Sequence, residues 1–171
     1  MTGAVVPELQ TERLLMRGWR EEDFEPWAEL YADDEVMRSL GRPGGLPPGD
    51  AWRELAVFAG HWALMGFGHW ALELRDTGEF VGHAGLLRPP EWPGLEVGWT
   101  VARRHWGRGF AGEAGRAAMG WARSELGADH VISLIAEGNH RSEGVAKKLG
   151  MTVEGRALVR GYELRVFGAD L

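Results

Sequence analysis

Cysteine is absent from this chain of 171 residues, and tyrosine occurs only twice, at Tyr31 and Tyr162. Without cysteine the protein can form no disulfide bond, no thiolate nucleophile and no cysteine-based metal site. The six histidines show no HExxH spacing, so we expect no bound metal ion. These absences exclude a thiol enzyme and argue against a metalloenzyme.

An excess of positive charge and a long apolar run are lacking as well. The formal net charge is -6, which argues against nucleic-acid binding, because phosphates require clustered lysine and arginine. Residues 55–72 carry no formal charge over 18 positions and reach the lower limit for a membrane span. This stretch contains His61, His69 and a Gly66-Phe67-Gly68 cluster. We therefore interpret it as a helix end, a turn and a strand start, and expect no membrane association.

The N-terminal residues 1–10 show no basic segment followed by an apolar run. This argues against a signal peptide, and we expect a cytoplasmic protein. The chain length fits one domain spanning residues 1–171. The composition, 44% hydrophobic and 26% charged, is that of an ordinary folded protein.

Alternating and helical patterns of apolar residues predict an α/β fold. Strands are expected at residues 13–17, 69–75, 80–87, 95–101 and 130–136, with two more within 152–167. Helices are expected at residues 21–40, 50–65 and 139–149, and after the glycine-rich stretch 107–112. Strand 95–101, its crossover helix and strand 130–136 form a parallel unit. The sequence thus predicts a mixed, mostly antiparallel sheet of about seven strands with about four helices.

At residues 103–111 a strand leads into a glycine-bearing turn that opens a helix. Gly107 and Gly109 let the backbone approach a ligand, and the N–H groups at the start of the helix attract anions. Arg103, Arg104 and Arg108 add positive charge at the same place. This combination suits a pyrophosphate group.

The same segment also satisfies the dinucleotide-binding pattern G-x-G-x-x-G at Gly107, Gly109 and Gly112, with Glu137 as a ribose ligand. The motif, however, lies beyond the end of its strand, and too little chain follows for the second half of a dinucleotide-binding domain. A Walker-type phosphate loop is excluded, because no Lys-Ser or Lys-Thr follows the glycines. A dinucleotide-binding protein is the main competing interpretation.

The segment Arg104-x-x-Gly107-x-Gly109 resembles the acetyl-CoA signature of the GNAT superfamily of N-acetyltransferases. Other segments resemble the branch of that superfamily that acetylates the N-terminal amines of ribosomal proteins. These segments are residues 11–14 (TERL), 95–99 (LEVGW), 109–114 (GFAGEA) and 139–151 (NHRSEGVAKKLGM). The resemblance covers nearly the whole chain and implies the GNAT fold, in which the two parallel strands splay apart.

The resemblance implies acetyl-CoA as the acyl donor and no metal. Backbone N–H groups of residues 106–111 would hold the pyrophosphate, and the pantetheine arm would lie between the splayed strands. The residues implied for cofactor binding are Trp99, Val101, Arg103, Arg104, Trp106, Gly107, Arg108, Gly109, Phe110, Ala111, Asn139 and Ser142. The acetyl group would pass directly from the thioester to the amine, in agreement with the absence of cysteine.

Direct transfer needs a base that takes a proton from the acceptor amine. We predict Glu96 for this role, acting through water. It shares a strand face with Gly98 and Thr100, a face that would point into the acceptor cleft. A carboxylate at the rim of the cleft is the alternative interpretation of Glu96. Glu163 and Glu154 are the reserve candidates.

The leaving thiolate needs a proton donor. Neither Tyr31 nor Tyr162 lies on the last helix, where many superfamily members place a tyrosine for this purpose. Ser142 stands where the ribosomal branch places a serine, and we assign it the role. Ser142 as a part of the helix start, and Asn139 as a plain helix N-cap, are the alternatives.

The sequence thus predicts an N-acetyltransferase that transfers the acetyl group to a primary amine within a ternary complex. A protein N-terminus, a polyamine, an amino acid and an aminoglycoside all fit as acceptors. A CoA-binding module without turnover is a second alternative. A homodimer is compatible with the resemblance.

Overall fold

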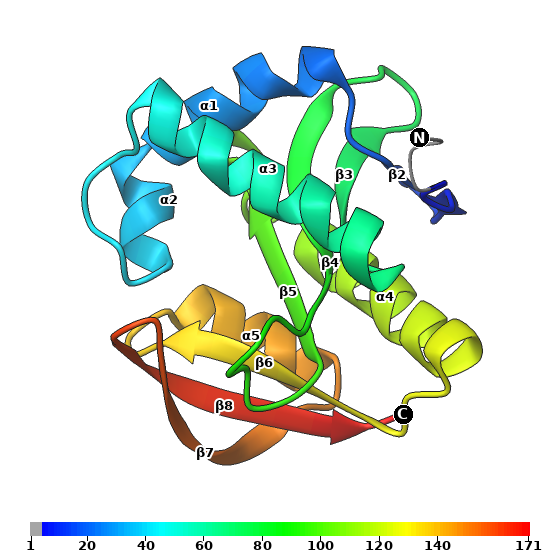
Figure 1. Ribbon diagram of the computed structural model, residues 1–171, viewed down its shortest axis with the longest axis vertical. Coiled ribbons are helices and arrows are strands. Elements are labelled where there is room, and N and C mark those ends of the chain that lie inside the picture. Colours follow the sequence, from blue (N-terminus) through cyan, green and yellow to red (C-terminus); the bar gives the residue numbers. More distant parts are fainter. Residues whose placement is uncertain (1–4) are drawn as a thin grey trace.

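The computed structural model describes residues 5–171, which form an eight-stranded sheet with helices on both faces (Figure 1). The sheet order is β1-β2-β3-β4-β5-β6-β8-β7. The strands are β1 (Leu9–Gln10), β2 (Leu14–Arg17), β3 (His69–Leu74), β4 (Phe80–Leu87), β5 (Glu96–Val101), β6 (His130–Ala136), β7 (Thr152–Val159) and β8 (Tyr162–Asp170). The helices are α1 (Phe24–Ala32), α2 (Asp34–Ser39), α3 (Pro48–Met65), α4 (Phe110–Leu126) and α5 (His140–Lys148), with 3-10 turns at Glu21–Asp23 and Arg103–His105.

The predicted strands are confirmed, and the short β1 is an addition that its two residues could not signal. The prediction of one helix over residues 21–40 is wrong. The chain breaks at Asp33, whose extended backbone ends α1, and whose side chain accepts a hydrogen bond from the Glu35 N–H to cap α2. The second predicted helix starts two residues earlier than expected, because Pro48 occupies its first turn, where a missing N–H costs nothing.

Two apolar cores cover the two faces of the N-terminal half of the sheet. One face packs against α1, α2 and α3 through residues such as Trp27, Met37 and Phe58. The other packs against α4, whose Phe110, Ala114, Ala118 and Ala122 are all buried. The crossover helix α4 is thereby fixed against the sheet at the point where β5 ends.

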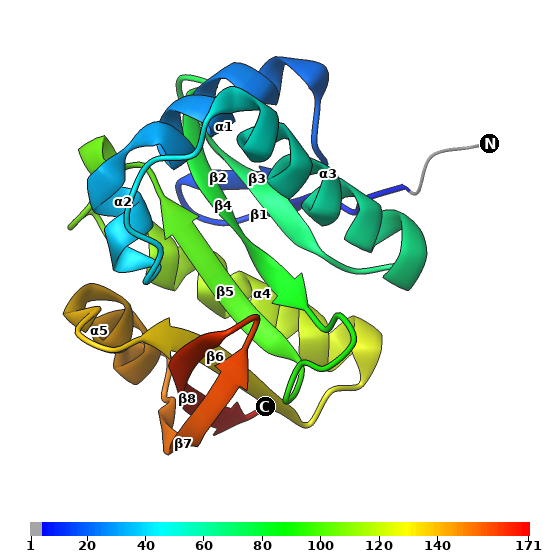
Figure 2. The same cartoon turned by 60° about the vertical axis from the view of Figure 1, so that its left-hand side comes forward.

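Strands β5 and β6 form the parallel pair of the sheet, and they diverge along their length (Figure 2). Their ladder contains one register pair, Glu96 with Ile132, next to a hydrogen bond of 2.9 Å from the Ile132 N–H to the Leu95 carbonyl. Within residues 5–171, the backbone groups of β5 beyond Glu96 have no strand partner on this side. The splay therefore opens the sheet in its middle, as the resemblance to the GNAT superfamily implied.

Residues 55–72 form the end of α3, a turn at Gly66 and the start of β3, in agreement with the sequence interpretation. Within residues 5–171, no helix has the length and apolar character needed to cross a bilayer.

Candidate active site

The glycine-bearing turn between β5 and α4 has the backbone that only glycine adopts easily. Gly107 and Gly109 have φ angles of 76° and 85°, in the left-handed region that costs other residues about 1 kcal/mol or more. Nothing lies within 4 Å of the position that a Cβ of Gly107 would take. No side chain caps the start of α4 at Gly109, so the N–H groups of its first turn face outward with the positive end of the helix dipole. The turn is therefore an open cradle for an anion.

A cavity of about 370 Å³, here named the turn cavity, extends from this cradle to α5 and the end of β5. Most of the residues predicted for cofactor binding line it. They are Trp99, Val101, Trp106, Gly107, Gly109, Phe110, Ala111, Asn139 and Ser142.

The three arginines that were expected to add charge here lie outside the lining. Arg103 pairs with Asp33 at 2.8 Å, and Arg104 pairs with Glu79 at 2.9 Å. Arg108 Nη1 lies 3.0 Å from His105 Nδ1, and its guanidinium covers the Phe110 ring at 4.8 Å. All three side chains are therefore engaged with other groups of the protein and do not line the turn cavity.

Positive charge reaches the turn cavity from α5 instead. Arg141 and Lys148 both line the cavity, and the Arg141 guanidinium stacks over the Trp106 ring at 4.3 Å. The two residues are seven positions apart and share a helix face with Val145. This spacing was visible in the sequence, but it indicates a ligand only when the face is known to point at the turn.

Asn139 and Ser142 form one unit at the start of α5. Asn139 Oδ1 accepts a hydrogen bond of 3.1 Å from the Ser142 N–H, which caps the helix. Asn139 Nδ2 donates to Ser142 Oγ at 3.0 Å and to the Ser39 carbonyl at 2.6 Å. The amide therefore ties α5 to α2 across the gap between β5 and β6.

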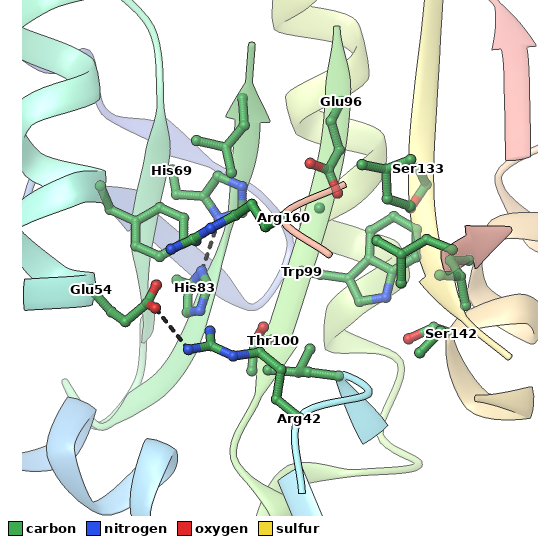
Figure 3. A pocket seen from close by; sticks show the side chains of 18 of the residues that line it. Arg42, Glu54, His69, His83, Glu96, Trp99, Thr100, Ser133, Ser142 and Arg160 are labelled. Atoms are coloured by element: carbon green, nitrogen blue, oxygen red, sulfur yellow. Dashed lines mark hydrogen bonds and ion pairs between the residues drawn. The ribbon is translucent and has the colours of Figure 1, made fainter. Parts of the chain in front are cut away.

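A second cavity of about 460 Å³ is here named the histidine cavity (Figure 3). It is lined by residues of α3, β4, β5 and β6. Glu96, Gly98 and Thr100 all line it, as their alternation on β5 predicted. Trp99, Asn139 and Ser142 line both cavities. The two cavities thus meet at the splay, and Ser142 is one of the residues at their boundary.

Glu96 is the carboxylate of the histidine cavity and is only 9% exposed. Burial raises its pKa to about 7, although hydrogen bonds from Trp92 and from the Leu134 backbone N–H act in the opposite direction. The hydrogen bond from Trp92 Nε1 to Glu96 Oε2 is 2.5 Å long. A carboxyl with this pKa exchanges protons readily near neutral pH.

The reserve candidates Glu154 and Glu163 lie away from both cavities. Glu154 lies 3.2 Å from the His130 ring, and Glu163 lies 3.6 Å from Arg156. Each is a partner in a surface ion pair, and neither lines the histidine cavity.

Two buried histidines that the sequence did not indicate line the same cavity. His69 Nδ1 lies 2.8 Å from His83 Nδ1, and His83 Nε2 lies 3.0 Å from the Tyr31 hydroxyl. Burial lowers the pKa of His69 and also that of His83, to about 3 for the latter, so both rings are neutral. Only the fold brings them together, because β3 and β4 contribute one histidine each.

Comparisons with known proteins agree with this geometry. Residues 13–152 match the family model described as an acetyltransferase (GNAT) domain. An uncharacterized N-acetyltransferase of Bacillus subtilis, YoaA, is 27% identical over 87% of this chain and 85% of its own length. The crystal structure of an acetyltransferase from Agrobacterium tumefaciens superposes with a TM-score of 0.85 at 30% identity, covering 96% of this chain and 94% of that one.

A spermidine N-acetyltransferase from Vibrio cholerae, solved with CoA and spermine, shares the fold with a TM-score of 0.72 at 16% identity, over 92% of this chain and 95% of that one. Fold and sequence together define an acyltransferase of the α/β class. The chain belongs to the GNAT family of N-acetyltransferases.

Proposed function

We propose that this protein transfers an acetyl group from acetyl-CoA directly to a primary amine that enters the histidine cavity. The observation that carries the proposal is the meeting of two cavities at the splay of β5 and β6. One cavity has an anion cradle and the other has a buried carboxylate. A donor and an acceptor held in the two cavities would touch at Ser142.

The turn cavity suits the phosphates and the pantetheine arm of acetyl-CoA. The backbone N–H groups of the turn and of the first turn of α4 would hold the pyrophosphate, with Arg141 and Lys148 as cationic neighbours. The arm would lie along β5 between Trp99 and Val101, where backbone groups lack a strand partner. Its thioester end would then reach the boundary between the cavities.

Three groups of the chain would act on the reacting atoms. Glu96 would take a proton from the acceptor ammonium, directly or through water, so that the nitrogen can attack the thioester carbon. A backbone N–H near the end of β5 would stabilise the oxyanion. Ser142 would donate its hydroxyl proton to the departing sulfur. Its oxygen already accepts a hydrogen bond from Asn139, which leaves the O–H free to donate.

The acceptor would bind among rings and short apolar side chains. The histidine cavity is lined by Phe58, Trp92 and Trp99, and also by Leu134 and Leu164. A cavity of about 460 Å³ has room for a small amine or for the first residue of a peptide. The acceptor is therefore proposed as an amine with an apolar neighbour.

The test is an assay of CoA release. The protein is incubated with acetyl-CoA and a panel of alkylamines, polyamines, amino acids and short peptides, and free thiol is followed with a reagent that cannot react with this cysteine-free chain. Release of CoA that depends on an amine, with the acetylated amine seen by mass spectrometry, supports the proposal. Tight acetyl-CoA binding without release indicates a binding module, and stabilisation by NAD instead of acetyl-CoA indicates a dinucleotide-binding protein.

A further inference from the structure

One ring nitrogen of the histidine pair has no partner. Among residues 5–171, His69 Nε2 is the buried side-chain polar atom that makes no hydrogen bond. A buried polar atom without a partner is unfavourable, because it has lost its hydrogen bonds to water. His69 itself is 3% exposed, and its ring faces the histidine cavity (Figure 3).

The unpaired nitrogen and the Glu96 carboxylate border the same space. A Cβ built on Gly98 would lie 3.4 Å from His69 Nε2 and 3.6 Å from Glu96 Oε1. A Cβ at Gly98 would already crowd the His69 ring, so the glycine makes room for the ring and the carboxylate on one side of β5. Both groups line the histidine cavity, in which the acceptor nitrogen would lie.

His69, His83 and Tyr31 form a chain of two hydrogen bonds. The chain has two possible arrangements, and in each of them both bonds are donated in the same direction. When His69 donates from Nδ1 to His83, His83 donates from Nε2 to Tyr31, and His69 Nε2 carries a lone pair. When Tyr31 donates to His83 and His83 donates to His69, His69 Nε2 carries the proton instead. Moving one proton along the chain converts the first arrangement into the second.

Acetylation of an ammonium removes two protons from one nitrogen. The first must leave before the nitrogen can attack, and the second leaves as the new C–N bond becomes an amide. A single carboxylate can hold only one of them. The histidine cavity is lined by two proton acceptors, Glu96 and His69, which matches this requirement.

We propose that Glu96 takes the first proton of the acceptor ammonium and that His69 Nε2 takes the second, with His83 and Tyr31 carrying that proton onward. The proposal rests on the function proposed above. As the amine N–H bond breaks, an N–H bond forms at His69 Nε2, the Nδ1 proton passes to His83 Nδ1, and the His83 Nε2 proton passes to Tyr31. Tyr31 releases its own hydroxyl proton to cavity water, so no charge stays in the chain.

The surroundings of His69 favour a neutral proton acceptor. His61 on α3, His83 on β4 and Glu96 on β5 are the titratable groups nearest to it. The same cavity is also lined by the ion pair of Arg42 and Glu54, 2.9 Å long, and by the exposed Arg160. Burial and the neighbouring rings lower the pKa of His69, so the lone pair is available at the pH of an assay. Once the acceptor nitrogen has bonded to the thioester carbon, it carries a positive charge. Its N–H is then acidic enough to give a proton to a weak base such as His69.

The experiment compares two acceptors that differ in the number of protons they lose. One is the alkylamine that the wild-type protein acetylates fastest, which enters as an ammonium. The other is the alkoxyamine that has oxygen in place of the carbon attached to nitrogen. It has nearly the same shape and is neutral at assay pH. The neutral acceptor loses one proton only, so either Glu96 or His69 alone suffices.

The decisive variant is His69→Asn, whose amide N–H can still donate to His83 while the Nε2 position is removed. We expect kcat/KM to fall by about 100-fold for the alkylamine and by less than about 3-fold for the alkoxyamine. Glu96→Gln should show the same selectivity, and the double variant should lose both activities. Equal losses for the two acceptors in His69→Asn, or no loss, would overturn the proposal.

Two further variants keep the result interpretable. Tyr31→Phe leaves His69 in place and removes the end of the chain, and it should also impair the alkylamine more than the alkoxyamine. His61→Asn is the matched control, because His61 is a buried histidine of the same cavity whose two nitrogens pair with the Phe67 carbonyl and the Arg88 N–H. It should change both acceptors by the same factor. Absence of transfer by the wild-type protein would instead refute the proposed function itself.

Discussion

Asn139 holds Ser142 from two sides, since its Oδ1 accepts from the Ser142 N–H and its Nδ2 donates to the Ser142 hydroxyl oxygen. Ser142→Ala keeps the first of these bonds and loses only the second. We therefore expect unchanged thermal stability and an acetyl-CoA dissociation constant within about 2-fold of wild type, with kcat lower by roughly 10- to 100-fold. Steady-state kinetics and calorimetry measure the two quantities. A wild-type kcat would leave Ser142 as a residue of the helix start only.

Gly107→Leu tests the anion cradle. A side chain at Gly107 would extend into open space, so nothing in the free protein opposes it except the left-handed backbone, at about 1 to 2 kcal/mol. It would, however, fill the place proposed for the pyrophosphate. We expect acetyl-CoA affinity to fall by at least about 100-fold, measured by calorimetry.

Gly127→Leu is the control for that variant. Gly127 ends α4 with a φ of 62° and has open space around its Cβ position, so it carries the same backbone strain away from both cavities. It should lose similar stability and keep acetyl-CoA affinity. If both variants bind acetyl-CoA equally well, the turn is not the phosphate site.

Local patterns in the sequence predicted most strands of the sheet and which residues of β5 share one face. The alternation of Glu96, Gly98 and Thr100 is a property of a single strand, and the structure places all three on the cavity. Tertiary pairing decided the rest. Arg103 and Arg104 are turned from the cavity by acids 70 and 25 positions away in the chain, and no local pattern encodes such partners.

The histidine pair depends on strand register in the same way. In the ladder of β3 and β4, His69 faces Gly85 and His83 faces Ala71, so the rings meet diagonally. A shift of one residue would send one ring to the other face. Glycines in α4 also differ in ways that only the fold decides. A Cβ at Gly115 would lie 2.9 Å from Leu149, whereas Gly112 and Gly120 have open space around their Cβ positions.

The hydrogen bond from Trp92 to Glu96 lowers the pKa of the carboxyl against the larger effect of burial. For an alkylamine, kcat/KM should fall as pH falls through about 7, because the base becomes protonated. Trp92→Phe removes the bond and keeps a ring, so the midpoint of this limb should move to higher pH. The pH profile of kcat/KM for both proteins measures the shift. A midpoint that stays in place or moves lower would contradict the assignment of the limb to Glu96.

Glu96 should also make the protein less stable as the pH rises. Its pKa is about 7 in the folded protein against an ordinary value of 4.5, so between these pH values the folded state binds the proton more tightly than the unfolded state. The free energy of unfolding should therefore fall across this window, by on the order of 3 kcal/mol in total. Glu96→Gln carries no titrating group and should lack this part of the decrease. Urea unfolding of both proteins at several pH values gives the difference, in which all other titrations cancel. If the free energies of unfolding of the two proteins change with pH in parallel, Glu96 is solvated like a surface carboxylate. Diverging curves would show that the fold keeps a destabilising base in the cavity, as expected where activity requires it.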